Sequence, residues 1–203
     1  MLVGVIVLTA IAVAAMTRSA PAPADAPKVA APVSPPPAGG VETKGPVVHV
    51  VENAMKDLDL IRPARSKIAD DFTLKTADGG TFRLHEQRGK VVLVNFWATW
   101  CPPCLEEMPA MQRLYDRHRH APFLMLAVSV DADSRLVAPF VKEQKFTFTV
   151  GLDPKMELAN AYGVRGLPSS FIVDREGHLA ALALGPRRWD TTAAHTLVDG
   201  MSR

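Results

Sequence analysis

The stretch that decides the fold is Val91–Cys104, VVLVNFWATWCPPC. Its first seven residues, Val91–Trp97, form a continuous apolar run interrupted only by Asn95, which is typical of a strand buried on both faces of a sheet. A helix is predicted to follow from Cys101 to about Arg119. The chain's two cysteines, Cys101 and Cys104, therefore stand where a central strand gives way to a helix.

Working outward from this stretch, the sequence predicts alternating strands and helices. On the N-terminal side, Asp78-Gly79-Gly80 favours a β-hairpin, because glycine supplies the positive φ that the turn requires. Near the C-terminus, a turn at Asp174–Gly177 favours antiparallel pairing of the last two strands. The other predicted strands are Phe72–Lys75, Thr81–Leu84, Phe123–Val130, Phe146–Val150, Phe171–Val173 and Leu179–Leu184, and the other predicted helices are Arg135–Glu143, Met156–Tyr162 and Asp190–Met201. The expected fold class is α/β, with a central mixed β-sheet flanked by helices, an N-terminal β-hairpin and a central αβ insertion.

The chain of 203 residues has room for one globular domain and an extension. The predicted segments are a signal anchor or signal peptide at 1–17, an Ala/Pro-rich linker at 18–48, a short helical lead-in at 49–66 and the globular domain at 67–203. The lead-in rests on helical spacing in Val47–Leu60, ahead of Pro63. Arg18, directly after the apolar run, favours an uncleaved anchor, while Ala22 and Ala24 leave signal cleavage open.

Charge and cysteine content exclude several classes of function. The 23 basic and 21 acidic residues are spread along the chain, so no nucleic-acid-binding patch stands out. Two cysteines are too few for the disulfide framework of a small secreted fold. The pair is therefore interpreted as a local chemical unit.

The placement of Cys101-Pro102-Pro103-Cys104 at a helix start predicts thiol chemistry. Unpaired backbone N–H groups and the helix dipole stabilise an anion there, which lowers the pKa of Cys101. Cys104, one turn further along, is expected to be more buried, and the spacing lets both sulfurs form a small disulfide ring. The prolines are tolerated because first-turn N–H groups have no helical acceptor.

Other interpretations of the cysteine pair stay open. A zinc site normally needs four ligands, and a haem attachment site would need histidine where Leu105 stands. A structural disulfide gains little from so short a loop. A copper-binding module using both thiols with His or Met is a rival from a different class, for which no metal ligands are assigned. His118 and His120 are interpreted as cations favoured by the dipole at the end of the helix from Cys101.

Two separated motifs resemble those of the thioredoxin superfamily. They are Asn95-Phe96-Trp97-Ala98-Thr99-Trp100-Cys101-Pro102-Pro103-Cys104 followed by Glu106-Glu107-Met108-Pro109, and Gly163–Asp174, GVRGLPSSFIVD. Within the superfamily the sequence is most similar to membrane-anchored thioredoxin-like proteins of the TlpA/ResA type, with a redoxin or AhpC/TSA-like domain. The resemblance covers about Ile68 to the C-terminus and implies a thioredoxin-like fold.

The resemblance also implies roles for individual residues. Pro168 corresponds to the family's cis-proline opposite the cysteines, which exposes the backbone of Leu167 to a bound peptide. Trp100 is expected at the rim of the substrate site, although packing in the core is an alternative. Asn95 stands where thioredoxin carries a proton-accepting aspartate, and it cannot take that proton. Glu107 matches a family glutamate, and we expect burial to raise its pKa so that it accepts the proton of Cys104; the alternative is a favourable first-turn charge.

The predicted function is that of a thiol:disulfide oxidoreductase without a cofactor, reducing protein disulfides. The family implies cytochrome c maturation or related cofactor insertion, with apocytochrome c or an oxidase copper-site protein as client and a membrane thiol protein as electron donor. The expected location is the inner membrane with the domain facing the periplasm, or the soluble periplasm if the signal is cleaved. A thiol oxidant or isomerase is the alternative within the enzymes. A peroxidase is disfavoured because no supporting Thr/Arg arrangement surrounds Cys101.

Overall fold

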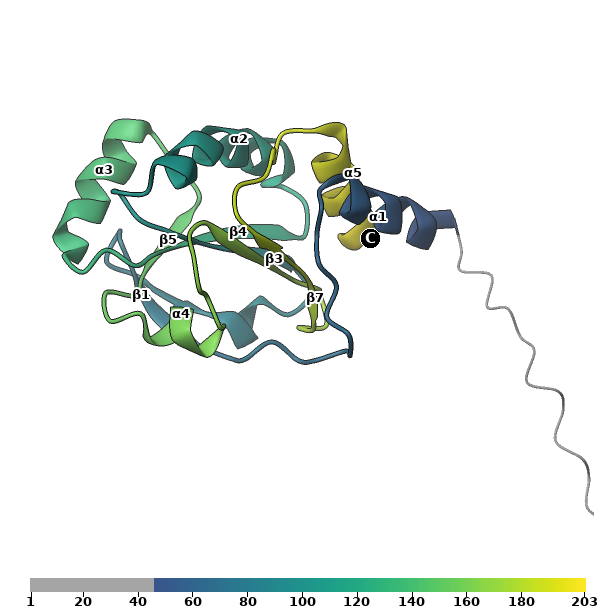
Figure 1. The fold of residues 1–203 in the computed structure, drawn as a ribbon, viewed down its shortest axis with the longest axis horizontal. Helices are drawn as coiled ribbons and strands as arrows, with labels where there is room; N and C mark the ends of the chain where they lie inside the picture. The colour runs from purple at the N-terminus through teal and green to yellow at the C-terminus, as the bar shows by residue number, and fades with distance from the viewer. Residues whose placement is uncertain (1–45) are drawn as a thin grey trace, which may run out of the picture. The chain divides into compact units, whose positions relative to one another are not determined.

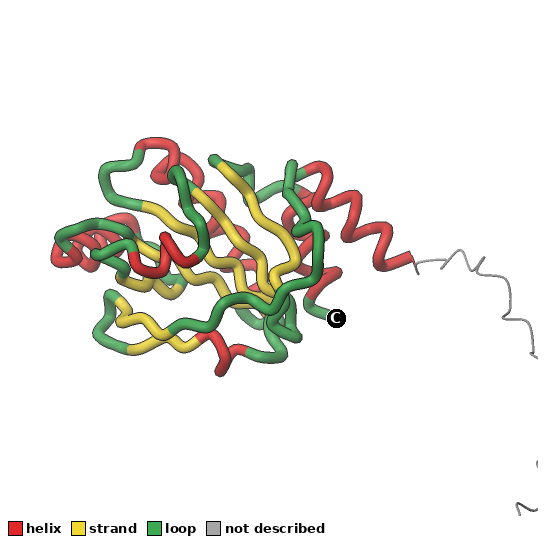
Figure 2. The backbone as a smooth tube through the Cα atoms, turned by 60° about the horizontal axis from the view of Figure 1, so that its bottom comes forward, coloured by secondary structure: helices red, strands yellow, loops and turns green. Residues whose placement is uncertain are grey.

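A computed structural model describes residues 46–203, and the predicted anchor and most of the predicted linker lie outside these residues. The described part of the chain forms one seven-stranded sheet with helices on both faces (Figures 1 and 2). Its strands are β1 (Thr73–Thr76), β2 (Thr81–Arg83), β3 (Val91–Trp97), β4 (Phe123–Ser129), β5 (Thr149–Leu152), β6 (Ser169–Val173) and β7 (Leu179–Leu184). Its α-helices are α1 (Pro46–Asp57), α2 (Pro102–His118), α3 (Val137–Gln144), α4 (Glu157–Ala161) and α5 (Thr192–Met201), and short 3₁₀ helices span Leu84–Gln87 and Ser134–Leu136.

The strand order is β2-β1-β5-β4-β3-β6-β7, and the sheet is mixed. Strands β3, β4 and β5 run parallel, as expected where helices α2 and α3 provide the crossover connections. The hairpin β1–β2 joins antiparallel to β5, and β6 and β7 complete the other edge antiparallel. The predicted α/β class, the N-terminal hairpin and the antiparallel final pair are confirmed.

Strand β3, which was predicted to be the central strand, lies inside the sheet between β4 and β6, and every residue of it is buried. Because side chains alternate along a strand, Phe96 and Asn95 point to opposite faces. Phe96 packs against Tyr162, which follows α4. Asn95, paired in register with Ser170 of β6, faces α2, which with α5 covers the other side of the sheet (Figure 1). The alternation thus directs one polar side chain of this interior strand toward the helix that carries Cys104.

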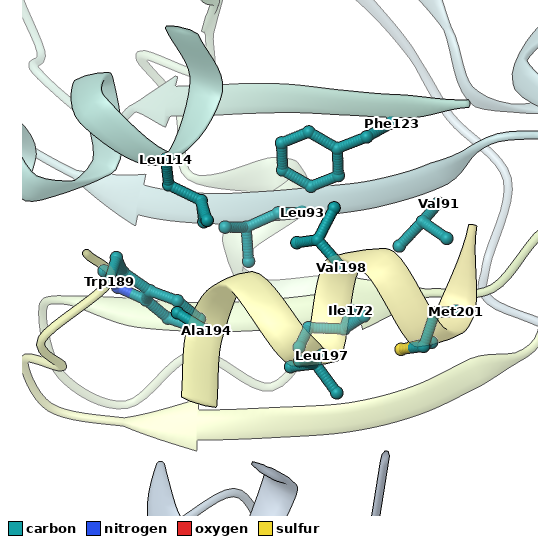
Figure 3. A pocket seen from close by; sticks show the side chains of 10 residues that line it. All are labelled: Val91, Leu93, Leu114, Phe123, Ile172, Trp189, Ala194, Leu197, Val198 and Met201. Atoms are coloured by element: carbon teal, nitrogen blue, oxygen red, sulfur yellow. The ribbon is translucent and has the colours of Figure 1, made fainter. Parts of the chain in front are cut away.

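Helix α5 covers the sheet with an apolar face. Figure 3 shows its side chains meeting those of β3, β4, β6 and α2 in a seam to which Trp189 also contributes. The residues of this seam are Val91, Leu93, Leu114, Phe123, Ile172, Trp189, Ala194, Leu197, Val198 and Met201. Fully burying a side chain of this size contributes about 1.5–3 kcal/mol, so the seam holds α5 and the loop before it firmly.

Most element boundaries differ from the prediction by one or two residues, and the largest differences are at β5 and α1. The strand expected at Phe146–Val150 begins three residues later, as β5 at Thr149–Leu152. Phe146 and Phe148 precede the strand, and their rings stack on each other with centroids 5.2 Å apart. An apolar run in the sequence does not distinguish aromatic residues packed before a strand from residues of the strand itself. The helix expected at Val47–Leu60 is α1, which begins at Pro46, inside the predicted linker boundary of 48. Proline suits the first helical turn, where its missing N–H has no acceptor.

Candidate active site

Cys101 and Cys104 form a disulfide at the start of α2, with their Cα atoms 5.3 Å apart. Cys101 is the residue before the helix, in an extended conformation, and its carbonyl accepts hydrogen bonds from the N–H groups of Cys104 and Leu105. Both cysteines are buried, Cys101 at 4% exposure and Cys104 at 0%. The disulfide bond means that the structure represents the oxidised state of the pair. Cys104 is the more buried of the two cysteines, as predicted.

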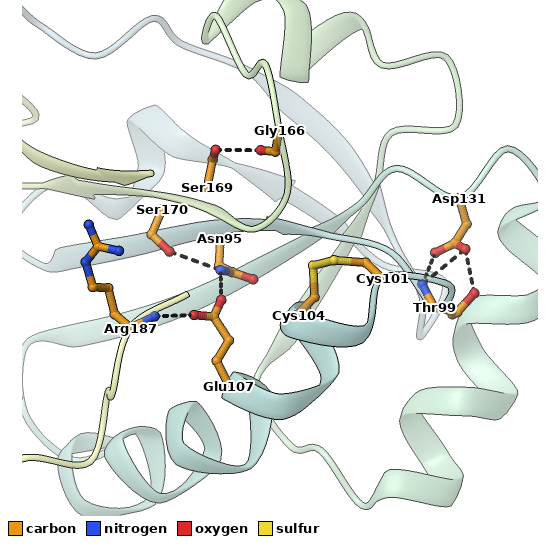
Figure 4. Close-up of a disulfide and its surroundings, with 10 residues drawn as sticks. All are labelled: Asn95, Thr99, Cys101, Cys104, Glu107, Asp131, Gly166, Ser169, Ser170 and Arg187. Atoms are coloured by element: carbon orange, nitrogen blue, oxygen red, sulfur yellow. Dashed lines mark hydrogen bonds between the residues drawn. A yellow bond between two sulfur atoms is a disulfide. The ribbon is translucent and has the colours of Figure 1, made fainter. Parts of the chain in front are cut away.

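A buried carboxylate that the sequence analysis did not single out holds the loop before Cys101. Asp131 accepts hydrogen bonds from the Thr99 N–H at 3.1 Å and from the Thr99 hydroxyl at 2.6 Å (Figure 4). Ser129 Oγ also donates to it at 2.7 Å. Asp131 comes just after β4, beside the end of the parallel strand β3. A polar residue at the carboxyl end of a predicted parallel strand is a candidate site residue, and this position could have identified Asp131 from the sequence. The contacts fix the path of the chain into Cys101.

A groove of about 450 Å³ opens beside Cys101, whereas Cys104 does not line it. Trp100 and Leu167 form part of its apolar wall, and Trp100 is 66% exposed. Arg165 brings a positive charge to the groove, and among the described residues no ion pair to it is found. The groove is lined by Trp100, Cys101, Pro102, Val130, Met156, Val164, Arg165, Gly166 and Leu167.

The predicted cis peptide bond at Leu167–Pro168 is confirmed. Pro168 itself is buried, and Leu167 is the residue of this pair that lines the groove. Of the two tryptophans next to the motif, Trp97 is fully buried in the core and Trp100 is at the surface, so the expected rim position applies to Trp100.

Glu107 lies one turn after Cys104 on α2 and is 5% exposed (Figure 4). Three groups donate hydrogen bonds to its carboxylate: Asn95 Nδ2 at 2.8 Å, the Arg187 backbone N–H at 2.8 Å and Trp189 Nε1 at 3.3 Å. Burial raises the pKa of Glu107 to about 7, against the lowering effect of these donors and of the Arg187 charge. The carboxyl is therefore poised to gain or lose a proton near neutral pH. The neighbouring Glu106 is exposed, as expected.

Asn95 connects Glu107 to strand β6, because its Nδ2 also donates to Ser170 Oγ at 3.0 Å. Its other polar atom, Oδ1, is buried and has no hydrogen-bond partner within residues 46–203. Ser170, Arg187 and Trp189 are contacts of the site that the sequence analysis missed. They lie 75 or more residues away from Asn95 or Glu107 in the chain, so only the packed sheet brings them together.

The histidines at the other end of α2 correct a prediction. His118 was expected to be a cation favoured by the helix dipole, but it is buried, and its Nε2 lies 2.9 Å from Nδ1 of His195 on α5. Burial lowers the pKa of His118, and desolvation also lowers that of His195. The contact between the two histidines was missed because residues 77 positions apart in the chain give no local signal.

No group of three or more His, Cys, Asp or Glu side chains that could hold a metal ion occurs in the described part of the chain. Within the same residues, no helix combines the length and the apolar character needed to cross a membrane.

Comparison with known proteins agrees with this geometry. Residues 66–182 match the model of the AhpC/TSA family. The thiol-disulfide oxidoreductase ResA of Geobacillus thermodenitrificans is 38% identical over 117 residues, which cover 58% of this chain and 67% of that protein.

Solved structures show the same fold. A putative thiol:disulfide interchange protein DsbE from Chlorobium tepidum has a TM-score of 0.62 and 32% identity, covering 68% of this chain and 97% of the other. An exposed lipoprotein thioredoxin from Streptococcus pneumoniae has a TM-score of 0.52 and 30% identity, covering 57% and 90%. The chain therefore belongs to the AhpC/TSA family within the thioredoxin superfamily, and it is a ResA-type thiol:disulfide oxidoreductase.

Proposed function

We propose that the protein reduces disulfide bonds of client proteins outside the cytoplasmic membrane, using Cys101 and Cys104 as its dithiol. One observation supports this most strongly. The disulfide of these two residues borders a surface groove through Cys101, and a buried carboxyl with a pKa of about 7 lies one turn along the same helix. Nucleophile, client site and proton acceptor are thus assembled around one helix start.

The exchange begins from the reduced protein. The Cys101 thiolate attacks one sulfur of the client disulfide, which forms a mixed disulfide and releases one client thiolate. Cys104 then gives its proton to the Glu107 carboxylate and attacks the Cys101 sulfur, and the second client thiolate leaves. Two electrons pass to the client, and the protein ends with the Cys101–Cys104 disulfide described above.

The groove supplies the client site in this proposal. Trp100 offers an exposed aromatic surface beside Cys101, and Leu167 and Pro168 form the opposite segment. No hydrogen bond is found to the backbone N–H or C=O of Leu167 in the described residues, so both groups are free to pair with an extended client segment. Client affinity would then come from backbone pairing next to the reactive sulfur.

The client pathway and location are proposed from the family. ResA-type proteins point to cytochrome c maturation or related cofactor insertion, with apocytochrome c or an oxidase copper-site protein as client. The apolar residues 2–16 support anchoring in the inner membrane with the domain in the periplasm, and the similarity to an exposed lipoprotein supports an extracytoplasmic domain. A membrane thiol protein would return the enzyme to its reduced state, because that compartment is oxidising.

Trapping experiments test the roles of the two cysteines. The reduced full chain is mixed with a synthetic peptide that contains one intramolecular disulfide, and the products are separated and weighed by mass spectrometry. We expect the wild type to reduce the peptide and form its own disulfide, Cys104→Ser to accumulate a mixed disulfide at Cys101, and Cys101→Ser to give neither product. A mixed disulfide formed equally well through Cys104 in Cys101→Ser would contradict the assignment of the nucleophile.

A further inference from the structure

Arg187 lies in the loop between β7 and α5, and its side chain, only 15% exposed, is hydrogen-bonded on all three nitrogens. Towards its own loop, Nη1 donates to the carbonyl oxygens of Leu184, Gly185 and Pro186 at 3.1, 3.3 and 3.0 Å. Towards the N-terminal lead-in, Nε donates to Leu58 O at 2.8 Å, and Nη2 donates to Asp59 O at 2.9 Å and to Asp59 Oδ2 at 3.0 Å. The guanidinium therefore joins this loop to the residues just after α1.

The same loop supplies two of the three donors to Glu107. The backbone N–H of Arg187 is 2.8 Å from Glu107 Oε2, and the indole Nε1 of Trp189 is 3.3 Å from the same oxygen. In Figure 4 the Arg187 side chain points away from Glu107 while its backbone nitrogen faces the carboxylate. Arg187 thus contacts Glu107 with its backbone N–H and the residues just after α1 with its side chain.

The segment after α1 offers a fixed point of attachment. Helix α1 packs on α5 so closely that a Cβ atom on Gly200 would lie 2.4 Å from Val51 Cγ2. Beyond the helix, Ile61 exchanges backbone hydrogen bonds with Leu182 of β7, at 2.8 and 2.9 Å. Leu58 and Asp59 are therefore held between two attached segments, and their carbonyls present defined acceptors to the guanidinium.

We propose that Arg187 is a positioning residue for the proton transfer from Cys104, because its guanidinium ties the 185–189 loop to the end of α1 and so holds two N–H donors at Glu107. On this proposal α1 is a supporting part of the active site, although it lies outside the part of the chain that resembles thioredoxin. The inference rests on the proposed role of Glu107 as proton acceptor.

The physical reasoning follows from the geometry of the guanidinium and from its charge. A connection without regular structure samples several conformations unless it is tied down, and the planar guanidinium can bond several carbonyls at once with little loss of freedom. Glu107 contacts the neutral side chains of Asn95 on β3 and Trp189 in the loop, Cys104 lies one turn before it on the same helix, and Arg187 contributes a positive charge. Loss of the side chain would loosen the donors and remove that charge, and both effects favour the protonated carboxyl.

The test compares Arg187→Gln with Arg62→Gln in the full-length chain. Arg62 provides a matched control, because it also donates hydrogen bonds to α1, at Met55 Sδ and Glu52 Oε1, and none of its hydrogen bonds goes to the loop between β7 and α5. The measured quantity is the rate at which Cys104 resolves a preformed mixed disulfide on Cys101, as a function of pH. We expect Arg187→Gln to move the midpoint of this profile upward by about half a pH unit or more, and Arg62→Gln to leave it unchanged.

Arg187→Lys covers the case in which the glutamine variant does not fold. Lysine keeps the charge but cannot reach both sets of carbonyls, so a smaller upward shift is expected. Whichever Arg187 variant folds is used for the decision. If its melting temperature falls but the midpoint of its pH profile is unchanged, Arg187 has a merely structural role and the proposal is contradicted. Glu107→Gln separates the two hypotheses. If this variant retains the wild-type midpoint, the proposed role of Glu107 is wrong. If Glu107→Gln abolishes the midpoint but the Arg187 variants do not shift it, only the proposed role of Arg187 is wrong.

Discussion

The two ends of helix α2 each carry a buried titratable side chain, yet they differ in what surrounds it. Near the N-terminal end, burial raises the pKa of Glu107 to about 7. At the C-terminal end, burial lowers the pKa of His118. In both cases the uncharged form is favoured, as desolvation requires.

The difference lies in the partners. Glu107 receives three hydrogen bonds and the influence of the Arg187 charge, which partly offset burial and leave it able to ionise one turn from the Cys101–Cys104 disulfide. His118 contacts a second histidine, and Asp199 lies 3.5 Å from its Nδ1, far along the helix from the cysteines. Both side chains thus have shifted pKa values, but only Glu107 lies close to the cysteines that we propose to react.

The largest expected effect is on catalysis at the N-terminal end. Glu107→Gln should slow the resolution of the mixed disulfide by about 100-fold at pH 7, because the glutamine amide cannot accept the proton of Cys104. The inflection of the rate near pH 7 should also disappear. Stopped-flow measurement of resolution from pH 5 to 9 checks both effects, and His118→Gln is the matched control, expected to leave the profile unchanged. An unaltered profile in Glu107→Gln would remove the carboxyl from the mechanism.

The second effect is on the stability of the oxidised protein. Since the pKa of Glu107 is higher in the folded state than its ordinary value of 4.5, the folded protein retains a proton that the unfolded chain has released between pH 4.5 and about 7. The contribution of Glu107 to the free energy of unfolding is therefore fully present below pH 4.5. It is lost as the pH rises through 7, and the total loss is about 3 kcal/mol. Urea unfolding at several pH values should show that Glu107→Gln lacks this fall.

A smaller effect of opposite sign is expected at the C-terminal end. The pKa of His118 lies below its ordinary value of 6.5 in the folded state, so the unfolded chain takes up its proton first as the pH falls. The stabilising contribution of the neutral histidine is present above pH 6.5 and is lost on acidification. His118→Phe should flatten this part of the urea-unfolding profile without changing the profile at Glu107. A variant with the wild-type slope would show that the His118–His195 contact does not control titration.

The smallest effect is expected for Trp189→Phe. The substitution keeps most of the apolar contact with the α5 seam but removes the Nε1 donor to Glu107, whose 3.3 Å distance marks the longest of the three hydrogen bonds. Loss of one donor to the carboxylate favours its protonated form, so the midpoint of the resolution profile should move upward slightly, by less than in Arg187→Gln. A downward shift would mean that the indole does not stabilise the ionised carboxylate.

Much of the fold could be predicted from the sequence because its signals are local. The apolar run Val91–Trp97 identified a strand buried on both faces of the sheet, although β4 and not β3 is the middle strand, and Asp78-Gly79-Gly80 identified the hairpin turn. Element boundaries that depend on the packing of aromatic rings were harder to predict, as the later start of β5 shows. The anchor or signal peptide at 1–17 and the linker at 18–48 stay predictions, because residues 1–45 lie outside the described part of the chain.

The site could be predicted in part. The placement of the cysteine pair at a helix start indicated Cys101 and Cys104, the resemblance indicated the cis bond before Pro168, and the expected rise in the pKa of Glu107 is found. The supporting groups were missed, since Asp131 and Arg187 reach the site only through the folded sheet and the β7–α5 loop. Periodicity reports which face of an element is apolar, but it does not report which distant backbone N–H meets a carboxylate.

The most direct test of the central claim is the equilibrium reduction potential of the Cys101–Cys104 couple, titrated in the full chain against a thiol buffer. A reductase of client disulfides should have a strongly reducing value, near the roughly −270 mV of thioredoxin. A value near the roughly −120 mV of a strong periplasmic oxidant would contradict the proposed direction of electron transfer. Failure to form the disulfide at all would contradict the redox role of the pair and favour metal binding by the two thiols.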